Sequence, residues 1–141
     1  MQSLDSLDAH LQTDFLDDYW SDDAKFHATP ALRQMSEKEW DDLAALIPQR
    51  SSRWLTRLAD VLYSAPPVHA VPMLLKLLQL LPSQPEFAEV HETAVDSLTA
   101  LADDGIQIAL GAEDITRLES LANSRSGSFA SNVRSLLNKS F

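Results

Sequence analysis

The sequence contains no cysteine, only three glycines, and few basic residues. Without cysteine, the chain can form no disulfide, no thiolate metal site and no cysteine nucleophile, which fits a reducing compartment. Gly105, Gly111 and Gly127 lie far apart, so the sequence offers no glycine-rich phosphate loop. The serine in "SGSF" at residues 126–129 has neither the preceding strand nor the second glycine of a nucleophile elbow.

Long hydrophobic runs are also missing. The most apolar stretch, residues 70–81, is interrupted by Pro72, Lys76 and Gln79. A membrane span needs about 20 apolar residues, which is more than this stretch supplies. The first ten residues do not show the basic region and apolar run of a secretory signal. We therefore expect a cytoplasmic protein with no membrane partner.

The chain does contain an ordinary balance of residues with an excess of acids. Hydrophobic residues make up 45% and charged residues 23% of its 141 positions, which is typical of a single folded domain. Residues 1–42 hold eleven acids and three basic residues, so they carry −8 of the net charge of −10. Such an acidic end attracts basic surfaces and repels phosphate backbones, so we expect no nucleic-acid partner. The alternative is that the charge only keeps a small protein soluble.

Helical periodicity extends along nearly the whole chain, and it predicts an all-α fold of about seven helices. Residues 1–35 are predicted to form an acidic N-terminal part of one domain that spans residues 1–141. In this part, residues 3–18 predict an amphipathic helix, with Leu4, Leu7, Leu11 and Phe15 on one face. Residues 21–35 predict a linker with a short helical turn, because Thr29-Pro30 interrupts the pattern.

Six further helices are predicted in residues 36–141, paired as three antiparallel hairpins. Caps and prolines place them at about 36–47, 51–65, 67–81, 85–104, 112–123 and 129–139. Ser36 and Glu39 predict a capping box, Ser51 or Ser52 is expected to cap the next helix, and Ser128 is expected to cap the last one. Pro72 is placed near the first turn of its helix, and the alternating residues 106–110 are interpreted as a buried connector.

The predicted hairpins recur at a regular interval. Leu58, Val95 and Val133 are separated by 37 and 38 residues, close to the period of HEAT and armadillo repeats. The central unit, AVPMLLKLLQLLPSQPEFAEVHETAVDSLTALADDG, resembles a HEAT repeat: a leucine-rich helix with proline precedes a helix that aligns Ala94 with Leu98. The resemblance implies a short α-solenoid that binds other proteins on a groove or at an exposed end. An ordinary irregular helical bundle is the alternative.

One stretch, DFLDDYWSDDAKF at residues 14–26, combines aspartates with large aromatic side chains. In one interpretation, its aromatic residues fasten the first helix onto the hairpin that carries Trp40 and Trp54, while the acids face water. In the other, an aromatic side chain ringed by carboxylates forms a hot spot for a basic partner, because the aromatic supplies buried area and the acids supply specificity. The candidate partner-binding residues are Asp14, Asp17, Asp18, Tyr19, Trp20, Asp22 and Asp23.

The sequence offers little that predicts catalysis or a cofactor. Its histidines, His10, His27, His69 and His91, share no spacing that brings two imidazoles together on one helical face, and each is interpreted as a surface or half-buried side chain. A cation site at Asp17, Asp18, Asp22 and Asp23 would lack the glycine and terminal glutamate of a calcium hand. We expect no enzymatic activity, no cofactor and no metal.

With its few helical hairpins behind an acidic N-terminal segment, the chain resembles bacterial immunity proteins, which neutralise toxins. This resemblance in size, helicity and charge implies that the partner is a basic toxin domain, bound through the acidic segment. A scaffold or adaptor that binds its partner on the apolar face of residues 67–104 is the second hypothesis. An enzyme with a metal at the aspartate cluster is the third. No feature of the sequence predicts the oligomeric state.

Overall fold

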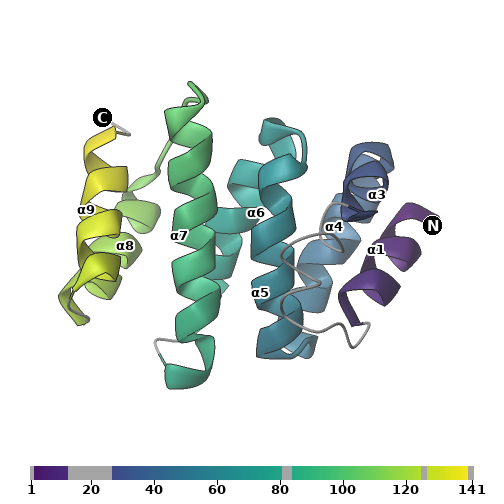
Figure 1. Ribbon diagram of the computed structural model, residues 1–141, viewed down its shortest axis with the longest axis horizontal. Helices are drawn as coiled ribbons and strands as arrows, with labels where there is room; N and C mark the ends of the chain where they lie inside the picture. Colours follow the sequence, from purple (N-terminus) through teal and green to yellow (C-terminus); the bar gives the residue numbers. More distant parts are fainter. Residues whose placement is uncertain (1, 13–26, 81–83, 125–126, 140–141) are drawn as a thin grey trace.

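The computed structural model describes residues 2–12, 27–80, 84–124 and 127–139 (Figure 1). Within these ranges the chain forms eight α-helices and no β-strand, which confirms the predicted all-α fold. The helices are α1 Gln2–Gln12, α3 Thr29–Gln34, α4 Glu37–Leu46, α5 Ser52–Val61, α6 Pro67–Leu80, α7 Ala88–Asp103, α8 Ala112–Ser124 and α9 Ser128–Lys139. Short 3-10 turns lie at η2 Ile47–Gln49, η3 Leu62–Ser64 and η4 Pro85–Phe87.

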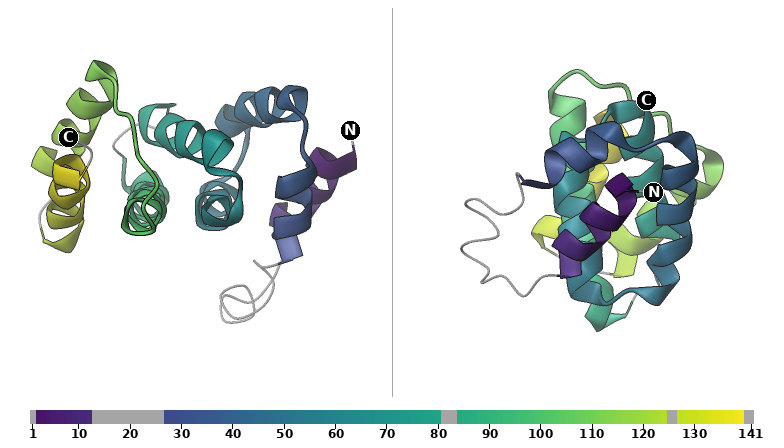
Figure 2. Two further views of the ribbon diagram at one scale, coloured as in Figure 1. Left: turned by 90° about the horizontal axis from the view of Figure 1, so that it is seen from above. Right: turned by 90° about the vertical axis from the view of Figure 1, so that its right-hand side faces the viewer.

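From α4 onwards, successive helices alternate between two rows (Figure 2). One row contains α5, α7 and α9, and each of these packs on the next. The other row contains α4, α6 and α8, with α6 in contact with both neighbours. Helices α1 and α3 pack on each other at one end of the molecule, and α9 lies at the opposite end (Figure 1). The resemblance of the individual hairpins to HEAT repeats stays a prediction.

Local sequence signals set several helix ends where they were expected. The Ser36 hydroxyl accepts a hydrogen bond from the Glu39 amide at 3.2 Å, and the Ser36 amide donates back to the Glu39 carboxylate at 3.3 Å. This is the predicted capping box of α4. The Ser51 hydroxyl caps α5 by accepting from the Trp54 amide at 3.2 Å.

The end of α7 is a Schellman motif. Gly105 has a φ of 91°, a left-handed conformation that glycine adopts without steric cost. The Gly105 amide donates to the Ala102 carbonyl, and the Ile106 amide donates to the Leu101 carbonyl, each at 3.0 Å. These bonds satisfy the last carbonyls of the helix and turn the chain towards α8.

Buried apolar side chains form one continuous cluster from Leu4 to Leu136. Helix α6 is covered on more than one side, because its buried leucines are spread around the helix at Leu74, Leu75, Leu77 and Leu78. Trp40, Leu43 and Ile47 are buried, whereas Leu46 is only partly buried. The indole ring of Trp40 on α4 stacks on the His69 ring of α6 with centroids 4.9 Å apart. This aromatic pair joins α4 to α6.

Some sequence predictions were wrong in detail. Residues 29–34, predicted as part of a linker with a short helical turn, form the six-residue helix α3, because Pro30 occupies the first turn, where its missing amide hydrogen has no helical acceptor. Pro72 lies in the interior of α6, since that helix already begins at Pro67. Ser128 is the first residue of α9, after Gly127, and so does not precede it as a cap. The predicted end of the first helix at residue 18 lies outside the described residues.

Two further corrections concern burial. In the connector at residues 106–110, only Ile108 is buried, while Gln107 and Ala109 are exposed. His91, interpreted from the sequence as a surface or half-buried side chain, is completely buried on α7. Sequence spacing alone did not place His91 inside, because its position depends on how α7 packs between its two neighbours.

Candidate functional site

The predicted partner-binding residues all lie outside the described part of the chain. Asp14, Asp17, Asp18, Tyr19, Trp20, Asp22 and Asp23 belong to residues 13–26. The aspartates considered for a cation site belong to the same range. What the structure does describe is how the two flanking helices, α1 and α3, are attached to the rest of the fold.

Three polar contacts attach α1 to α4, α5 and the turn between them. Near its N-terminus, the Leu4 amide donates to the buried Glu39 carboxylate at 2.7 Å. At its middle, Asp8 accepts from the Arg50 guanidinium at 2.9 and 3.1 Å and from the Trp54 indole N–H at 3.0 Å. Near its C-terminus, the buried Arg57 donates to the Leu11 carbonyl at 3.3 Å. The contacts at the two ends satisfy main-chain groups that a helix leaves without intrahelical partners.

The Asp8 contact shows that part of the N-terminal acidity is used inside the fold. Burial alone would raise the pKa of Asp8, but hydrogen bonds from Arg50, Gln12 and Trp54, together with the charge of Arg50, outweigh it and lower the pKa. The Arg50 guanidinium also lies 5.7 Å from the centre of the Trp54 ring. A carboxylate of α1 therefore attaches this helix to Arg50 and to the Trp54 helix. The aromatic contacts predicted for residues 14–26 lie outside the described residues.

Glu39 is shared between two helix starts. The Leu4 amide is the strongest cause of the lowered pKa of Glu39, and the Ser36 amide and hydroxyl add to it. The carboxylate therefore accepts main-chain hydrogen bonds from α1 and from the cap of α4 at once. A side chain predicted as a local cap also fixes the position of a helix 35 residues earlier.

The other flank of residues 13–26 is attached through α3. Ala28 and Leu32 are buried, and α3 packs on α1. The rings of His10 on α1 and His27, just before α3, stack with centroids 6.3 Å apart. The sequence spacing had excluded only two histidines on one helical face, so it did not bear on this contact. In the part of the chain that the structure describes, no three metal-ligating side chains gather as a metal site would require.

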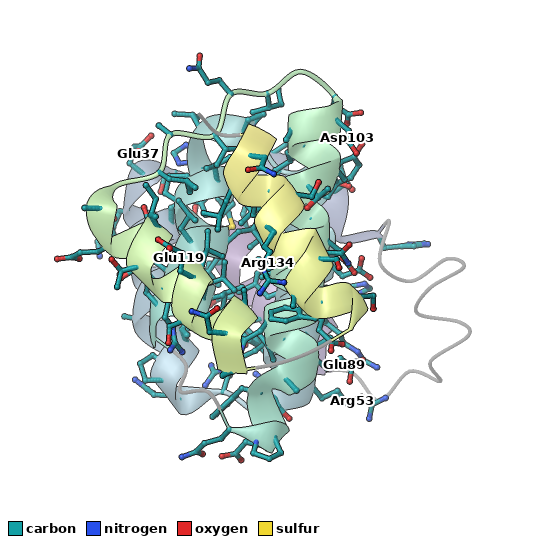
Figure 3. The ribbon with its side chains drawn as sticks, turned by 90° about the vertical axis from the view of Figure 1, so that its left-hand side faces the viewer. Glu37, Arg53, Glu89, Asp103, Glu119 and Arg134 are labelled. Carbon is teal, nitrogen blue, oxygen red and sulfur yellow. The ribbon has the colours of Figure 1, made fainter. Side chains whose placement is uncertain are left out.

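A stripe of exposed acids that the sequence analysis did not single out lies on α7. Glu89, Glu92, Asp96 and Asp103 are spaced by three, four and seven residues, which places them along one face. Figure 3 shows Glu89 and Asp103 on the same side of the molecule as Arg53 of α5. Partial desolvation raises the pKa of Asp96, and the nearby Glu92 carboxylate raises it further. The helical spacing of these acids was the signal that could have found them.

An apolar groove of about 610 Å³ lies between α6 and the connector that leads to α8. Its α6 wall includes Val68, which is 74% exposed, with Val71 and Leu75 beside it. Lys76 and Gln79 of the same helix also line it, and Gln79 donates a hydrogen bond to Asp114 at the start of α8. Ile106, Gln107 and Ala109 form the connector wall. An exposed valine in a groove of this kind is typical of a binding surface.

None of the helices in the described ranges combines the length and the hydropathy needed to cross a bilayer. No family model, no curated protein and no solved structure matches the chain.

Proposed function

We propose that this chain is a non-enzymatic protein-binding module that takes a basic partner through its acidic N-terminal segment, as an immunity protein takes a toxin. The observation that carries the proposal is the charge asymmetry, since −8 of the net −10 lies in residues 1–42. An acidic inhibitor suits a basic toxin, because complementary fields raise association rates by about 10–10³-fold. Tyr19 and Trp20, within the same segment, are residue types that dominate binding energy at interfaces.

The attachment of the flanking helices supports this proposal. Segments that carry binding residues work best when a rigid scaffold positions them. Residues 13–26 are preceded by α1, which Glu39, Asp8 and Arg57 attach to the fold at three points. They are followed by α3, whose Leu32 is fully buried. A binding segment between two anchored ends loses less conformational entropy on binding than a free terminus would.

The test is a double charge reversal, Asp17→Lys with Asp18→Lys, measured against the product of any toxin reading frame found next to that of this chain. Association should slow by about ten-fold or more at low salt, and its salt dependence should flatten, because steering by long-range charge is lost. Glu86→Lys with Glu119→Lys is the matched control, since it makes the same charge change at exposed positions on η4 and α8. If the variant and the unsubstituted chain associate at the same rate across the salt series, the proposal that the acidic segment binds the partner is refuted.

A second candidate function is a scaffold or adaptor that binds its partner on the apolar groove. The exposed side chain of Val68 in the wall of that groove favours it. An adaptor of this kind should keep its partner in a pull-down with the Asp17→Lys, Asp18→Lys variant and lose it when Val68 becomes charged. An immunity protein that uses the acidic segment should show the opposite result.

A further inference from the structure

The connector between α7 and α8 has main-chain groups that the fold leaves unpaired. Within the described residues, none of the N–H or C=O groups of residues 107–110 makes a main-chain or side-chain hydrogen bond. The hydrogen bonds stop at Ile106, whose amide closes the end of α7, and resume at Gly111, whose amide donates to Asp114 at 3.0 Å. Unpaired groups along an accessible segment are available to a partner.

The burial of the connector alternates from one residue to the next. Ile108 is buried and Ile106 and Leu110 are partly buried, whereas Gln107 and Ala109 between them are exposed. A period of two is that of an extended chain, in which successive side chains point to opposite sides. Figure 3 shows this connector leaving α7 beyond Asp103 and crossing to α8, the helix that carries Glu119.

The connector borders the apolar groove, so a chain lying along the connector would also contact the side chains that line the groove. Ile106, Gln107 and Ala109 form one wall, and Val68, Val71 and Leu75 contribute to the wall of α6. That wall also contains a carbonyl without its usual α-helical donor. Pro72 has no amide hydrogen, so the Val68 carbonyl, four residues earlier, lacks the donor of the regular α-helical pattern.

Acidic residues stand at both ends of the connector. Asp103 and Asp104 precede it and Glu113 and Asp114 follow it. Tyr63 donates a hydrogen bond to Asp104, and Gln79 donates one to Asp114, so one carboxylate at each end is held in place. Lys76 is the cation that lines the groove itself. A segment lying along the connector would therefore run between two pairs of negative charges, which favours basic residues at its ends.

We propose that this groove binds an extended peptide segment of a partner protein, which pairs through its main chain with residues 107–110. The peptide places alternate apolar side chains against Val68, Val71 and Leu75, and its terminal basic residues lie near Asp104 and Glu113. A helical ligand would fill the groove but leave the connector unpaired, because a helix satisfies its own main-chain groups. A second copy of this chain fits poorly, since antiparallel pairing of two connectors would bring like charges together.

This inference rests on the second candidate function and names the ligand class for that surface. The probe is the blocked octapeptide Lys-Val-Thr-Val-Thr-Val-Thr-Lys, titrated into the isotope-labelled full chain. Amide resonances of Gln107 to Leu110 should shift, and their hydrogen exchange should slow by about ten-fold or more on saturation. The same peptide with alternate main-chain amides methylated should bind about ten-fold more weakly or not at all.

Two further comparisons test the side-chain contacts. Val68→Asp should abolish the shifts, and the fold should be unaffected because Val68 is 74% exposed. Ser120→Asp is the matched control, since it adds the same charge at an exposed position of α8 outside the groove. Replacing the terminal lysines of the peptide by glutamates should weaken binding by about five-fold or more.

Several results would overturn the proposal. One is equal binding of the methylated and unmethylated peptides, and another is an absence of shifts at Gln107 to Leu110. The proposal would also fail if a helix-forming peptide shifted the groove resonances while the extended one did not, or if the chain formed a dimer through this face. A partner protein that is still captured in a Val68-dependent manner in any of these cases would leave the adaptor function standing. The peptide inference and the function can therefore fail separately.

Discussion

Asp8 and Arg50 form a two-pronged ion pair across 42 positions of the sequence, with Arg50 Nη2 at 2.9 Å and Nε at 3.1 Å from the carboxylate oxygens. The pair is only 21% and 24% exposed, and Trp54 donates to the same carboxylate. It attaches α1 to the turn between α4 and α5. The acidic N-terminal part of the chain is therefore partly an internal structural element, and its charge is not wholly displayed to solvent.

Removing this pair should destabilise the protein. Arg50→Ala should lower the free energy of unfolding by about 1–2 kcal/mol, because hydrogen bonds between charged groups in a partly buried site exceed the worth of an exposed pair. Urea denaturation followed by tryptophan fluorescence measures it. Lys38→Ala is the control, since the Lys38 side chain is 76% exposed and its amine lies 3.6 Å from the Asp42 carboxylate. Equal losses in the two variants would show that the Asp8 contact contributes no more than a surface pair.

Glu39 should make stability depend on acidic pH. Its pKa lies below the ordinary value of 4.5, chiefly because the Leu4 amide donates to it. The unfolded chain then binds more protons than the folded one in the range below 4.5, so stability is present above that pH and is lost as the pH falls through the folded pKa. Glu39→Gln should lower stability at pH 7 and flatten the decline in acid.

Chemical denaturation at a series of pH values from 7 down to about 3 measures this dependence. Glu119→Gln, at an exposed position of α8, should follow the unsubstituted chain. The role of the Leu4–Glu39 contact would be disproved by a Glu39→Gln profile that declines as steeply as that of the unsubstituted chain.

The ionised Asp96 carboxylate should lower the stability of the fold, whereas the ionised Glu39 carboxylate raises it. Partial desolvation, and then the charge of Glu92, raises its pKa above 3.8. Below the raised pKa the folded state binds the extra proton, so its ionisation costs stability as the pH rises through that range. Asp96→Asn should therefore raise stability at pH 7, by about 0.5 kcal/mol or less because the site is open to solvent.

Thermal unfolding of Asp96→Asn and of Glu92→Gln checks both causes. The Glu92→Gln variant should show a smaller increase in melting temperature than Asp96→Asn, since it removes only the neighbouring negative charge. A lower melting temperature for Asp96→Asn at pH 7 would contradict this account.

The two glycines that flank the connector should respond differently to alanine. Gly105 has a φ of 91°, so Gly105→Ala should cost about 1 kcal/mol of backbone strain, although no atom lies within 4 Å of the added carbon. Gly111 has no left-handed φ, and its added carbon would make an ordinary 3.6 Å contact with Asp114. Gly111→Ala should therefore be neutral or slightly stabilising. Comparable losses of unfolding free energy in the two variants would show that the left-handed conformation of Gly105 in the Schellman motif is not the cause of the loss.

The sequence predicted helix ends well where a signal is local. The Ser36–Glu39 box and the Ser51 cap were readable because the donors and acceptors lie within three residues of each other. Helix α3 was predicted only as a short helical turn, because Thr29-Pro30 is equally consistent with a break and with a helix start. For the candidate site, the acids at residues 14–23 stay a prediction. The sequence indicated an apolar face over residues 67–104, but it did not predict the groove between α6 and the connector to α8.

By itself, the sequence determined the all-α class, most helix boundaries and the apolar positions that enter the core, because helical periodicity and caps act over one or two turns. Only the tertiary structure decided that Glu39 serves two helices, that Asp8 is held by Arg50 and Trp54, and that His10 meets His27. It also decided that residues 107–110 keep their main-chain groups unpaired beside a groove. These relationships join residues that are distant along the chain. They depend on how helices pack in three dimensions, which local spacing does not encode.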